Sequence, residues 1–392
     1  MVRALGIDPG TGSFDLVVVE KDRVVWEESI DTPLIAKNPG VLVEAVEKAG
    51  QVDIIAGPSG YGTPVVCNND IIDPYRFAVE VLLLSKPRDI DEGVRRGELG
   101  IMVYKALAEV VRELWKRKLP VCYIPSVILL PTIPRYRKIN KIDMGTADKL
   151  AVTVLAVYDQ SRRLGIHYSE TSFILVEMGF GYNAVIGVEN GRVVDGIGGT
   201  LTPMGFLTAG VLDGEVVALG RTWSRSDVFY GGVATLCGVE DPVKALEKSR
   251  SDNLCRDGFN AMYEGIVKTV KAVLASVSKP REIILSGRLT RIPEIYEEIA
   301  KKLENIAPTT KLRGLDGAKI SKEAGQGYAV IGEGLAGGFF RELVEYMGIK
   351  SARGTVLDNV YHPRLARARS DIISSYRECL TREAFNRILG NH

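Results

Sequence analysis

The sequence predicts an α/β protein built from two domains. At 392 residues the chain is long enough to bury more than one hydrophobic core. A pattern of strand, glycine-rich turn, strand, polar hairpin and strand opens the chain and returns after residue 170. Segments with apolar residues at spacings of three and four accompany each copy, which is typical of helices packed on a sheet. We therefore expect two mixed sheets, each covered by helices.

The first copy starts with three strands, which we place at residues 3–7, 16–20 and 24–28. "PGVLVEAVEKAG" then predicts a helix that ends at Gly50, and "VDIIAG" predicts a buried strand. Residues 70–118 are mostly helical by periodicity. Four prolines exclude a helix across "LPVCYIPSVILLPTIPRYRK", which we expect to be extended or irregular and to join the two domains.

The second copy follows a helix predicted at 146–164, and its strands are "SFILVEMG", "YNAVIGVENG" and "RVVDGIGG". A helix at 258–277, the strand "EIILSG" and two further helical segments complete it. The Arg-rich end of the chain is expected to add surface helices. We place the two domains at 1–143 and 144–338, and a helical C-terminal extension at 339–392.

Composition narrows the classes of function. With 50 basic and 49 acidic side chains and a net charge of +1, the chain lacks the electrostatic footprint of a nucleic-acid-binding protein. Its five scattered cysteines contain no C-x-x-C pair and it has three histidines, so we expect buried thiols rather than a zinc site or a disulfide framework. No signal peptide precedes the first strand and no apolar run could span a bilayer. We expect a cytoplasmic protein that binds no membrane.

The glycine-rich turn "DPGTGS" between the first two strands carries the first chemical signal. Gly10 and Gly12 leave main-chain N–H groups open to close approach by an anion, and Thr11 and Ser13 add hydroxyl donors. Asp8 repels phosphate, so we interpret it as a ligand, through water, of a Mg²⁺ ion that bridges phosphate oxygens. A plain hairpin turn would account equally well for this stretch taken alone.

A second turn of the same kind favours nucleotide binding. "VEMGFGYNAV" repeats the acid-and-glycine hairpin in the other half of the chain, with Glu177 as its acid. Two such hairpins suit a nucleotide held in a cleft between the domains, although the chain contains no Walker motif. The strand "EIILSG" ends where a glycine lets an adenine ring lie against the backbone. The residues expected to contact the nucleotide are Gly10, Thr11, Gly12, Ser13, Gly179, Phe180, Gly181, Tyr182, Asn183, Ser286, Gly287 and Arg288.

These three motifs, in this order, resemble those of the actin, sugar-kinase, acetate-kinase and heat-shock-ATPase superfamily. "GIDPGTGSFD" looks like its first phosphate motif, "LVEMGFGYNAVIG" like its second and "IILSGRL" like its adenosine motif. "GTADKLAVTVLAV" and "GYAVIGEGLAGG" look like its two interdomain helices. The resemblance implies two ribonuclease-H-like, actin-like domains with Mg·ATP in the cleft between them, and Asp8 and Glu177 as the acids that hold the metal through water.

Residues 170–338 look most like butyrate kinase and related acyl kinases, and the whole chain resembles an archaeal butyrate-kinase-like family. "NGRVVDGIGGTLTPMGFLTAGVLDGEVV" is similar to the segment that follows the second phosphate hairpin in those enzymes. Two features depart from the acyl-kinase pattern. Asp8 stands where acyl kinases have Asn, and "MGTADK" replaces a histidine-rich stretch before the first interdomain helix. By analogy with acyl kinases alone, a homodimer is expected.

The group that accepts the phosphoryl group stays open between a carboxylate and a hydroxyl. In sugar kinases a Gly-Asp at the start of this helix supplies the general base, which makes Asp148 the candidate base; an acid that stabilises its own helix dipole is an equal alternative. A carboxylate acceptor needs no base, because it is already a nucleophile. The resemblance places the acceptor at Ser59, Gly60 and Tyr61, with Arg76 as a candidate carboxylate clamp or a plain surface arginine.

We interpret the chain as an ATP-dependent phosphotransferase that acts on a small metabolite. Asp8, Asp148 and Glu177 are the expected catalytic residues, and domain closure would exclude water from the transfer. Two other classes stay open. An ATPase switch would hydrolyse ATP to move a partner protein, and a nucleotide sensor would bind ATP without turnover.

Overall fold

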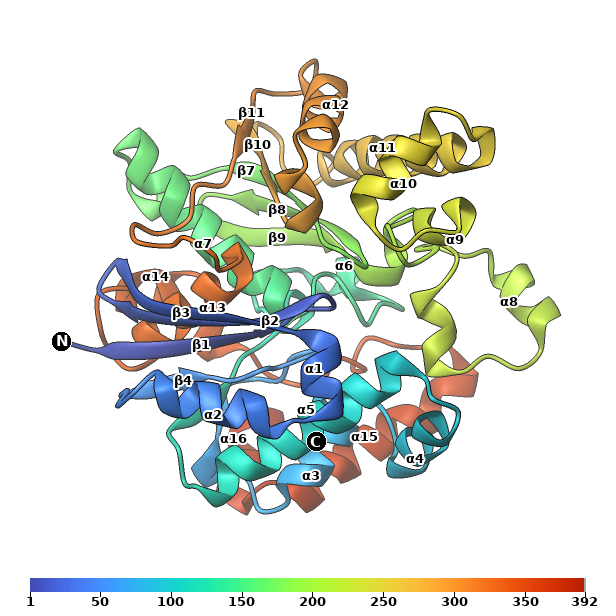
Figure 1. The fold of residues 1–392 in the computed structure, drawn as a ribbon. Coiled ribbons are helices and arrows are strands. Elements are labelled where there is room, and N and C mark those ends of the chain that lie inside the picture. Colours follow the sequence, from blue (N-terminus) through green and yellow to red (C-terminus); the bar gives the residue numbers. More distant parts are fainter. Residues whose placement is uncertain (391–392) are drawn as a thin grey trace. The chain divides into compact units, whose positions relative to one another are not determined.

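Two mixed sheets organise the chain (Figure 1), and the strands that the two sheets share follow the same order. This computed structural model describes residues 1–390 and divides into two units. The first contains Met1–Ile142, Thr146–Tyr168 and the chain from Arg313 onward; the second contains Asp143–Gly145 and Ser169–Leu312.

The first sheet has the order β3-β2-β1-β4-β6-β5. Its first three strands are antiparallel, β4 and β6 run parallel to β1, and β5 is antiparallel to β6. Near-continuous apolar runs form β1 and β2 because both faces of this part of the sheet are buried. The strands are β1 (Arg3–Pro9), β2 (Ser13–Glu20), β3 (Arg23–Asp31), β4 (Ile54–Ala56), β5 (Val66–Cys67) and β6 (Val121–Tyr123).

Helix α13 (Glu323–Leu335) packs directly on β1, β2 and β4, and α7 (Ala147–Leu164) packs on α13. Small residues allow this close contact. A Cβ at Gly6 of β1 would lie 2.3 Å from the main-chain nitrogen of Ala329. The other α-helices of this unit are α1 (Thr32–Lys37), α2 (Gly40–Lys48), α3 (Pro74–Arg76), α4 (Pro87–Arg95), α5 (Leu99–Lys116), α6 (Arg135–Lys138), α14 (Arg341–Tyr346), α15 (Ala366–Cys379) and α16 (Arg382–Leu389).

The second sheet has the order β11-β10-β7-β8-β9. Its strands are β7 (Phe173–Met178), β8 (Asn183–Glu189), β9 (Arg192–Ile197), β10 (Glu282–Ser286) and β11 (Thr309–Lys311). Helix α11 (Asn253–Val273) packs on β7, β8 and β9 and buries the core of this unit. The other α-helices of this unit are α8 (Gly214–Gly220), α9 (Val233–Cys237), α10 (Pro242–Ser249) and α12 (Pro293–Leu303).

The internal repeat predicted from the sequence is confirmed by the strand orders. In each unit an antiparallel three-stranded meander is extended by parallel strands beside its first strand. Each meander also has an irregularity between its second and third strands, at Val18/Val19 and at Gly187/Val188. The repeat is therefore one of topology, which explains why it is visible as a pattern of strands and turns rather than as repeated residues.

The helices predicted at 146–164 and in the C-terminal extension are present as α7 and as α14, α15 and α16. Residues 391 and 392 of that extension lie outside the described part. Both α7 and α13 belong to the first unit, as does β6, which lies in the proline-rich stretch. This division reflects compactness, so the domain boundaries drawn at 143 and 338 stay a prediction. Across the described residues, no helix is both long and apolar enough to traverse a membrane.

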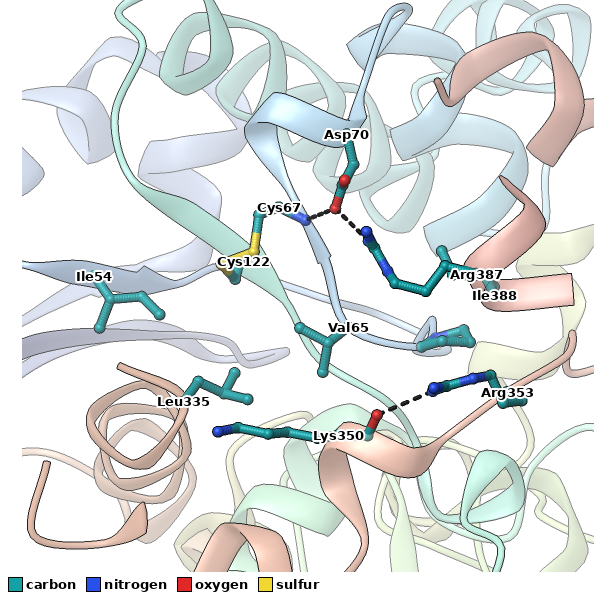
Figure 2. A pocket seen from close by; sticks show the side chains of 11 residues that line it. Ile54, Val65, Cys67, Asp70, Cys122, Leu335, Lys350, Arg353, Arg387 and Ile388 are labelled. Atoms are coloured by element: carbon teal, nitrogen blue, oxygen red, sulfur yellow. Dashed lines mark hydrogen bonds and ion pairs between the residues drawn. A yellow bond between two sulfur atoms is a disulfide. The ribbon is translucent and has the colours of Figure 1, made fainter. Parts of the chain in front are cut away.

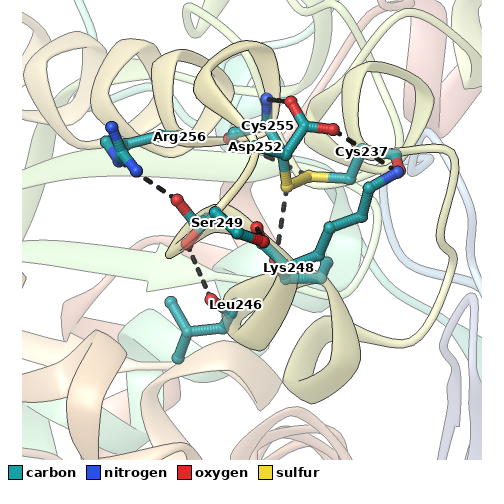
Figure 3. Close-up of a disulfide and its surroundings, with 9 residues drawn as sticks. Cys237, Leu246, Lys248, Ser249, Asp252, Cys255 and Arg256 are labelled. Carbon is teal, nitrogen blue, oxygen red and sulfur yellow. Dashed lines mark hydrogen bonds and ion pairs between the residues drawn. A yellow bond between two sulfur atoms is a disulfide. The ribbon is translucent and has the colours of Figure 1, made fainter.

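The expectation that the cysteines are unpaired thiols is wrong for four of the five. Cys67 of β5 and Cys122 of β6 face each other in register and form a disulfide (Figure 2). Cys237 at the end of α9 and Cys255 in α11 form a second one (Figure 3), and Cys379 is a buried free thiol. Sequence separations of 55 and 18 residues carry no signal for pairing, because the sheet register and helix packing bring the cysteines together. The cytoplasmic location loses its support from reduced thiols and stays a prediction.

We expect these disulfides to stabilise the fold. Loop-closure entropy predicts losses of about 4 kcal/mol for Cys67→Ser and about 3 kcal/mol for Cys237→Ser under oxidising conditions. Chemical unfolding of oxidised wild type and variants measures these losses, and counting thiols in denatured, unreduced protein should detect only Cys379. Five reactive thiols, or equal stability with and without reductant, would contradict the pairing.

Candidate functional site

The first predicted hairpin joins β1 to β2 and places Asp8 beside Lys322, a residue that the sequence analysis missed. Asp8 is buried, and its Oδ2 accepts a hydrogen bond of 2.7 Å from Lys322 Nζ. The same ammonium group donates to the main-chain oxygen of Ser13 at 3.1 Å. A Cβ on Gly10 would lie 2.3 Å from Lys322 Nζ, so the glycine also makes room for this lysine. The hairpin therefore combines a buried acid with a cation.

A second carboxylate fixes the start of α13 against this hairpin. Asp15 Oδ1 accepts hydrogen bonds from the hydroxyls of Ser13 (2.9 Å) and Ser29 (2.7 Å). Its Oδ2 accepts one from the main-chain nitrogen of Lys322 at 2.6 Å. Burial raises the pKa of Asp8, Lys322 opposes this, and the charges of Asp148 and Asp15 add to the rise. Asp8 thus lies in a site where additional positive charge would be stabilised.

Asp148 lies in the first turn of α7 and belongs to the same electrostatic cluster. Burial acts to raise its pKa, but Lys149, the Thr146 hydroxyl and Lys322 outweigh burial and hold that pKa below its usual range. The ion pair between Lys149 Nζ and Asp148 Oδ2 measures 2.7 Å. Asp148 is therefore a carboxylate at neutral pH. This state is compatible both with a general base and with the helix-dipole role considered for it.

The structure brings the predicted acceptor loop to the start of α7. The main-chain oxygen of Gly60 accepts a hydrogen bond of 3.2 Å from Ala147, the residue before Asp148. Ser59 is fully buried and its hydroxyl bridges the Gly57 oxygen (2.8 Å) and the Ile124 nitrogen (2.9 Å), so this hydroxyl shapes the loop. Tyr61 is held through its main-chain nitrogen by the oxygen of Leu82 at 2.9 Å.

Arg76, the candidate carboxylate clamp, pairs with carboxylates of the chain itself. Its guanidinium contacts Glu80, at 3.4 Å, and Glu378 of the C-terminal extension. Glu80 also accepts from Lys86 at 3.0 Å and from the hydroxyl of Ser375 in α15. Arg76 therefore helps to hold α15 against α3 within the first unit, and its role in acceptor binding stays a prediction.

Tyr328 of α13 is another residue that the sequence analysis missed. It is fully buried among Asp8, Asp148 and Ser59. Burial and the charges of the two aspartates raise its pKa well above the ordinary value, so its hydroxyl stays protonated. Its only sequence signal was its position in a helix with many small residues.

In the second unit, the predicted phosphate hairpin lies against the predicted adenosine motif. Glu177 of β7 is opposite Ser286 of β10 in the parallel register, and both are buried. Asn183 of β8 donates through Nδ2 to the main-chain oxygen of Met204 at 3.1 Å. Within the described residues, the buried Asn183 Oδ1 and Ser286 Oγ atoms have no hydrogen-bond partner. Such orphaned atoms are rare in native proteins and indicate a place for water or ligand.

Gly287 and Arg288 complete this arrangement. Gly287 has a φ of +98°, and a Cβ there would lie 2.4 Å from the Met178 oxygen and 2.7 Å from Glu177 Oε1. The Arg288 guanidinium lies over the Phe180 ring, 5.9 Å from its centre. The two predicted motif segments of the second unit, the phosphate hairpin and the adenosine motif, thus meet at one end of β7 and β10.

A buried acid beside this unit's second glycine pair was also missed. Asp143 accepts a hydrogen bond of 2.8 Å from the Gly145 nitrogen, and it packs against Gly198 and Gly199. A Cβ on Gly199 would lie 1.9 Å from Asp143 Oδ2. The sequence gives no signal for this contact, because the two segments are more than fifty residues apart.

Comparison with known proteins identifies the family. The sequence profile described as "Protein of unknown function (DUF1464)" matches residues 6–362, which is most of the chain. The chain belongs to this family. No curated protein matches the sequence.

The chain is also similar to solved structures of kinases. A propionate kinase from Francisella tularensis aligns with a TM-score of 0.54 and 14% identity over 84% of this chain and 98% of that one. An acetate kinase from Porphyromonas gingivalis aligns with a TM-score of 0.52 and 13% identity over 84% and 98%. The acetate kinase from Entamoeba histolytica gives 0.50 and 12% over 78% and 87%. At these identities the similarity shows the fold, so the predicted pair of actin-like domains is confirmed.

We expect the Asp8–Lys322 pair to be a strong determinant of stability in the first unit. Lys322→Met leaves a buried carboxylate without its cation, which should lower the free energy of unfolding by about 3–5 kcal/mol. Chemical unfolding measures this, with the exposed Lys319→Met as the matched control. The double variant Asp8→Asn/Lys322→Met should recover part of the loss. A Lys322→Met protein as stable as the control would contradict the pairing.

We expect Gly287 to tolerate no side chain. Gly287→Ala should destabilise the second unit by about 1–3 kcal/mol from backbone conformation alone, and by more because its Cβ meets Met178 and Glu177. Gly238→Ala is a matched control, since Gly238 has a φ of +61° but no atom within 4 Å of an added Cβ. Equal losses in the two variants, measured by chemical unfolding, would rule out the close contact.

Proposed function

We propose that the protein is an ATP-dependent phosphotransferase that binds Mg·ATP through both units and transfers its terminal phosphoryl group to a small metabolite. One observation carries the proposal. Each unit presents a buried acid and a glycine turn at the same place in its meander, Asp8 in the first and Glu177 in the second. A nucleotide that contacts both hairpins explains why this feature occurs twice in a kinase-like fold.

The residues of the first hairpin suit a hydrated magnesium ion. Across residues 1–390, no three His, Cys, Asp or Glu side chains are grouped to hold a metal ion directly. Mg²⁺ commonly keeps several waters and uses one or two carboxylates together with substrate phosphates. Asp8 would hold such an ion, whose charge would neutralise charge on the transferring phosphoryl group. Lys322, already at the hairpin, would add a second cation next to the phosphates.

The second hairpin suits the rest of the nucleotide. Asn183 Oδ1 and Ser286 Oγ are buried polar atoms with unused hydrogen-bonding capacity. Gly287 leaves main chain exposed to a flat ring, and the Arg288 guanidinium provides a planar cation beside it. We assign adenosine to this end and the phosphates to the glycine turns.

The acceptor is a carboxylate or a hydroxyl, and Asp148 distinguishes the two. A short carboxylic acid, as the butyrate-kinase resemblance implies, needs no base. A sugar or polyol hydroxyl does, and the ionised Asp148 beside the Gly60 loop would accept its proton. The same carboxylate could orient a water molecule, which favours ATP hydrolysis coupled to a partner protein as the second candidate function.

Calorimetric titration with Mg²⁺ and a non-hydrolysable ATP analogue tests nucleotide binding. We expect saturable binding that is at least about tenfold weaker in Asp8→Asn and Glu177→Gln. Glu264→Gln, at an exposed acid of α11, should bind like wild type. A ligand at about 100 times its Kd should also stabilise the protein by about 2.7 kcal/mol. Absence of binding, or binding that neither variant weakens, would overturn the proposal.

Product analysis with carboxylates, sugars and polyols then identifies the acceptor class. With a hydroxyl acceptor or water, Asp148→Asn should lower the rate by about 10²–10⁴-fold. With a carboxylate acceptor the same variant should keep most of its activity. Because the pKa of Asp148 is lowered, hydroxyl transfer should hold its rate as pH falls from neutral toward the ordinary range of aspartate. A strong ATPase that no metabolite affects would favour the switch.

A further inference from the structure

A basic pocket of about 450 Å³ lies in the first unit, away from the hairpin (Figure 2). One of its lining residues is Ile54, the first residue of β4, whereas Asp8 lies near the last residue of β1. The two strands are parallel and Ile54 pairs with Ala4, so Ile54 lies at the end of the sheet away from Asp8. Helix α13 runs between them, from Lys322 to Leu335 in the pocket wall, a length of about 20 Å.

Three cationic side chains line this pocket, from segments that the sequence analysis left without a role. Lys350 and Arg353 follow α14, and Arg387 comes from α16. Arg353 donates through Nη1 to the main-chain oxygens of Lys350 (3.0 Å) and Ala352 (2.7 Å). Throughout residues 1–390 it has no carboxylate partner, so its charge is available. Lys350 shares Glu345 with Arg341, at 3.4 Å and 3.1 Å.

The carboxylates near these cations are already satisfied by the protein. Asp70 Oδ2 accepts from Arg387 Nη2 at 2.7 Å and from the Cys67 nitrogen at 2.9 Å, as Figure 2 shows. A smaller adjoining pocket also contains Arg353 and Arg387, together with Asp358. Asp358 accepts hydrogen bonds from the main chain and the hydroxyl of Thr355, at 2.9 and 2.7 Å. The pocket lining therefore contains three cationic side chains and one carboxylate, that of Asp70.

Apolar groups form the rest of the wall. Ile54, Val65, Leu335, Ile388 and the Cys67–Cys122 disulfide surround the space between the cations. The volume is within the range of pockets for small organic ligands. A planar guanidinium matches the oxygens of a carboxylate or a phosphate, and apolar walls favour a hydrocarbon body.

We propose that this pocket binds a small organic oxyanion, a carboxylate or a phosphate monoester with an apolar body, at a site separate from the nucleotide. Arg353 contacts the oxyanion, Lys350 adds charge, and the walls at Val65 and Leu335 cover the apolar part. The proposal does not depend on the proposed phosphotransferase activity, because no residue of the pocket belongs to either glycine hairpin.

Calorimetric titration of the full chain in non-reducing buffer tests the site. The probes are benzoate and phenyl phosphate, with benzamide as the uncharged analogue of benzoate and inorganic phosphate as the anion without a body. We expect saturable binding of benzoate, phenyl phosphate or both at millimolar concentration or below, and none of benzamide. Which of the two binds more tightly identifies the oxyanion. Inorganic phosphate should bind more weakly than phenyl phosphate.

Substitutions place the binding in this pocket. Arg353→Gln, which removes no ion pair, should weaken the bound probe by at least about tenfold. Leu335→Gln should weaken phenyl phosphate without affecting inorganic phosphate. Arg367→Gln is the matched control, since its side chain on α15 is 92% exposed. Saturation with the Mg·ATP analogue should leave probe binding in place. Absence of binding by both probes, or equal binding in wild type and Arg353→Gln folded to the same stability, would overturn the site.

Discussion

The close contact of α13 with β1 and α7 is the constraint on which the first unit depends. A Cβ on Gly327 would lie 2.1 Å from the main-chain oxygen of Ala151, and one on Gly6 would lie 2.5 Å from the oxygen of Gly325. The backbone of α13 therefore lies in direct contact with the backbones of β1 and α7, and glycine makes this close approach possible. This contact fixes the position of α13 against β1 and α7. Because α13 begins at the first hairpin, Lys322 reaches Asp8 and the main chain of Lys322 reaches Asp15.

The two units share one topology, but the charged groups around their hairpins differ. In the first, burial alone would favour a neutral Asp8, and Lys322 stabilises its charged form. In the second, the hairpin acid lies beside Ser286 and Gly287, with a guanidinium over an aromatic ring. An acid paired with a lysine suits phosphates and a metal ion. A glycine at positive φ beside buried polar atoms that lack hydrogen-bond partners suits a base and a sugar.

The C-terminal extension is part of the first unit rather than a surface decoration. Ser375 reaches the buried Glu80, the Tyr376 hydroxyl donates to Thr63 at 2.9 Å, and Arg387 pairs with Asp70. Thr63 ends the loop that also carries the predicted acceptor residues. The extension therefore helps to hold that loop in place through Tyr376. It also supplies Lys350, Arg353 and Arg387 to the basic pocket. These contacts explain why the extension contains buried polar side chains such as Ser375.

Much of the fold could be predicted from the sequence, whereas the residues that contact the predicted site residues could not. The strands, the two glycine turns, the repeat and the motif at Ser286 are local patterns, since they depend on periodicity and on residues a few positions apart. Lys322, Tyr328 and Asp143 could not be predicted in their roles, and neither could the cysteine pairs. Lys322 is 314 residues from Asp8, and no spacing rule connects them.

The sequence by itself therefore determined which segments become strands, helices and glycine turns, because local conformational preference and burial pattern depend on neighbouring residues. Only the tertiary structure decided which charges meet. The register of β5 with β6 decided that Cys67 meets Cys122. The close packing of α13 on β1 decided that Lys322 pairs with Asp8. The packing of α16 in the first unit decided that Arg387 pairs with Asp70. Long-range contacts of this kind depend on how whole elements pack, and packing is a property of the assembled chain.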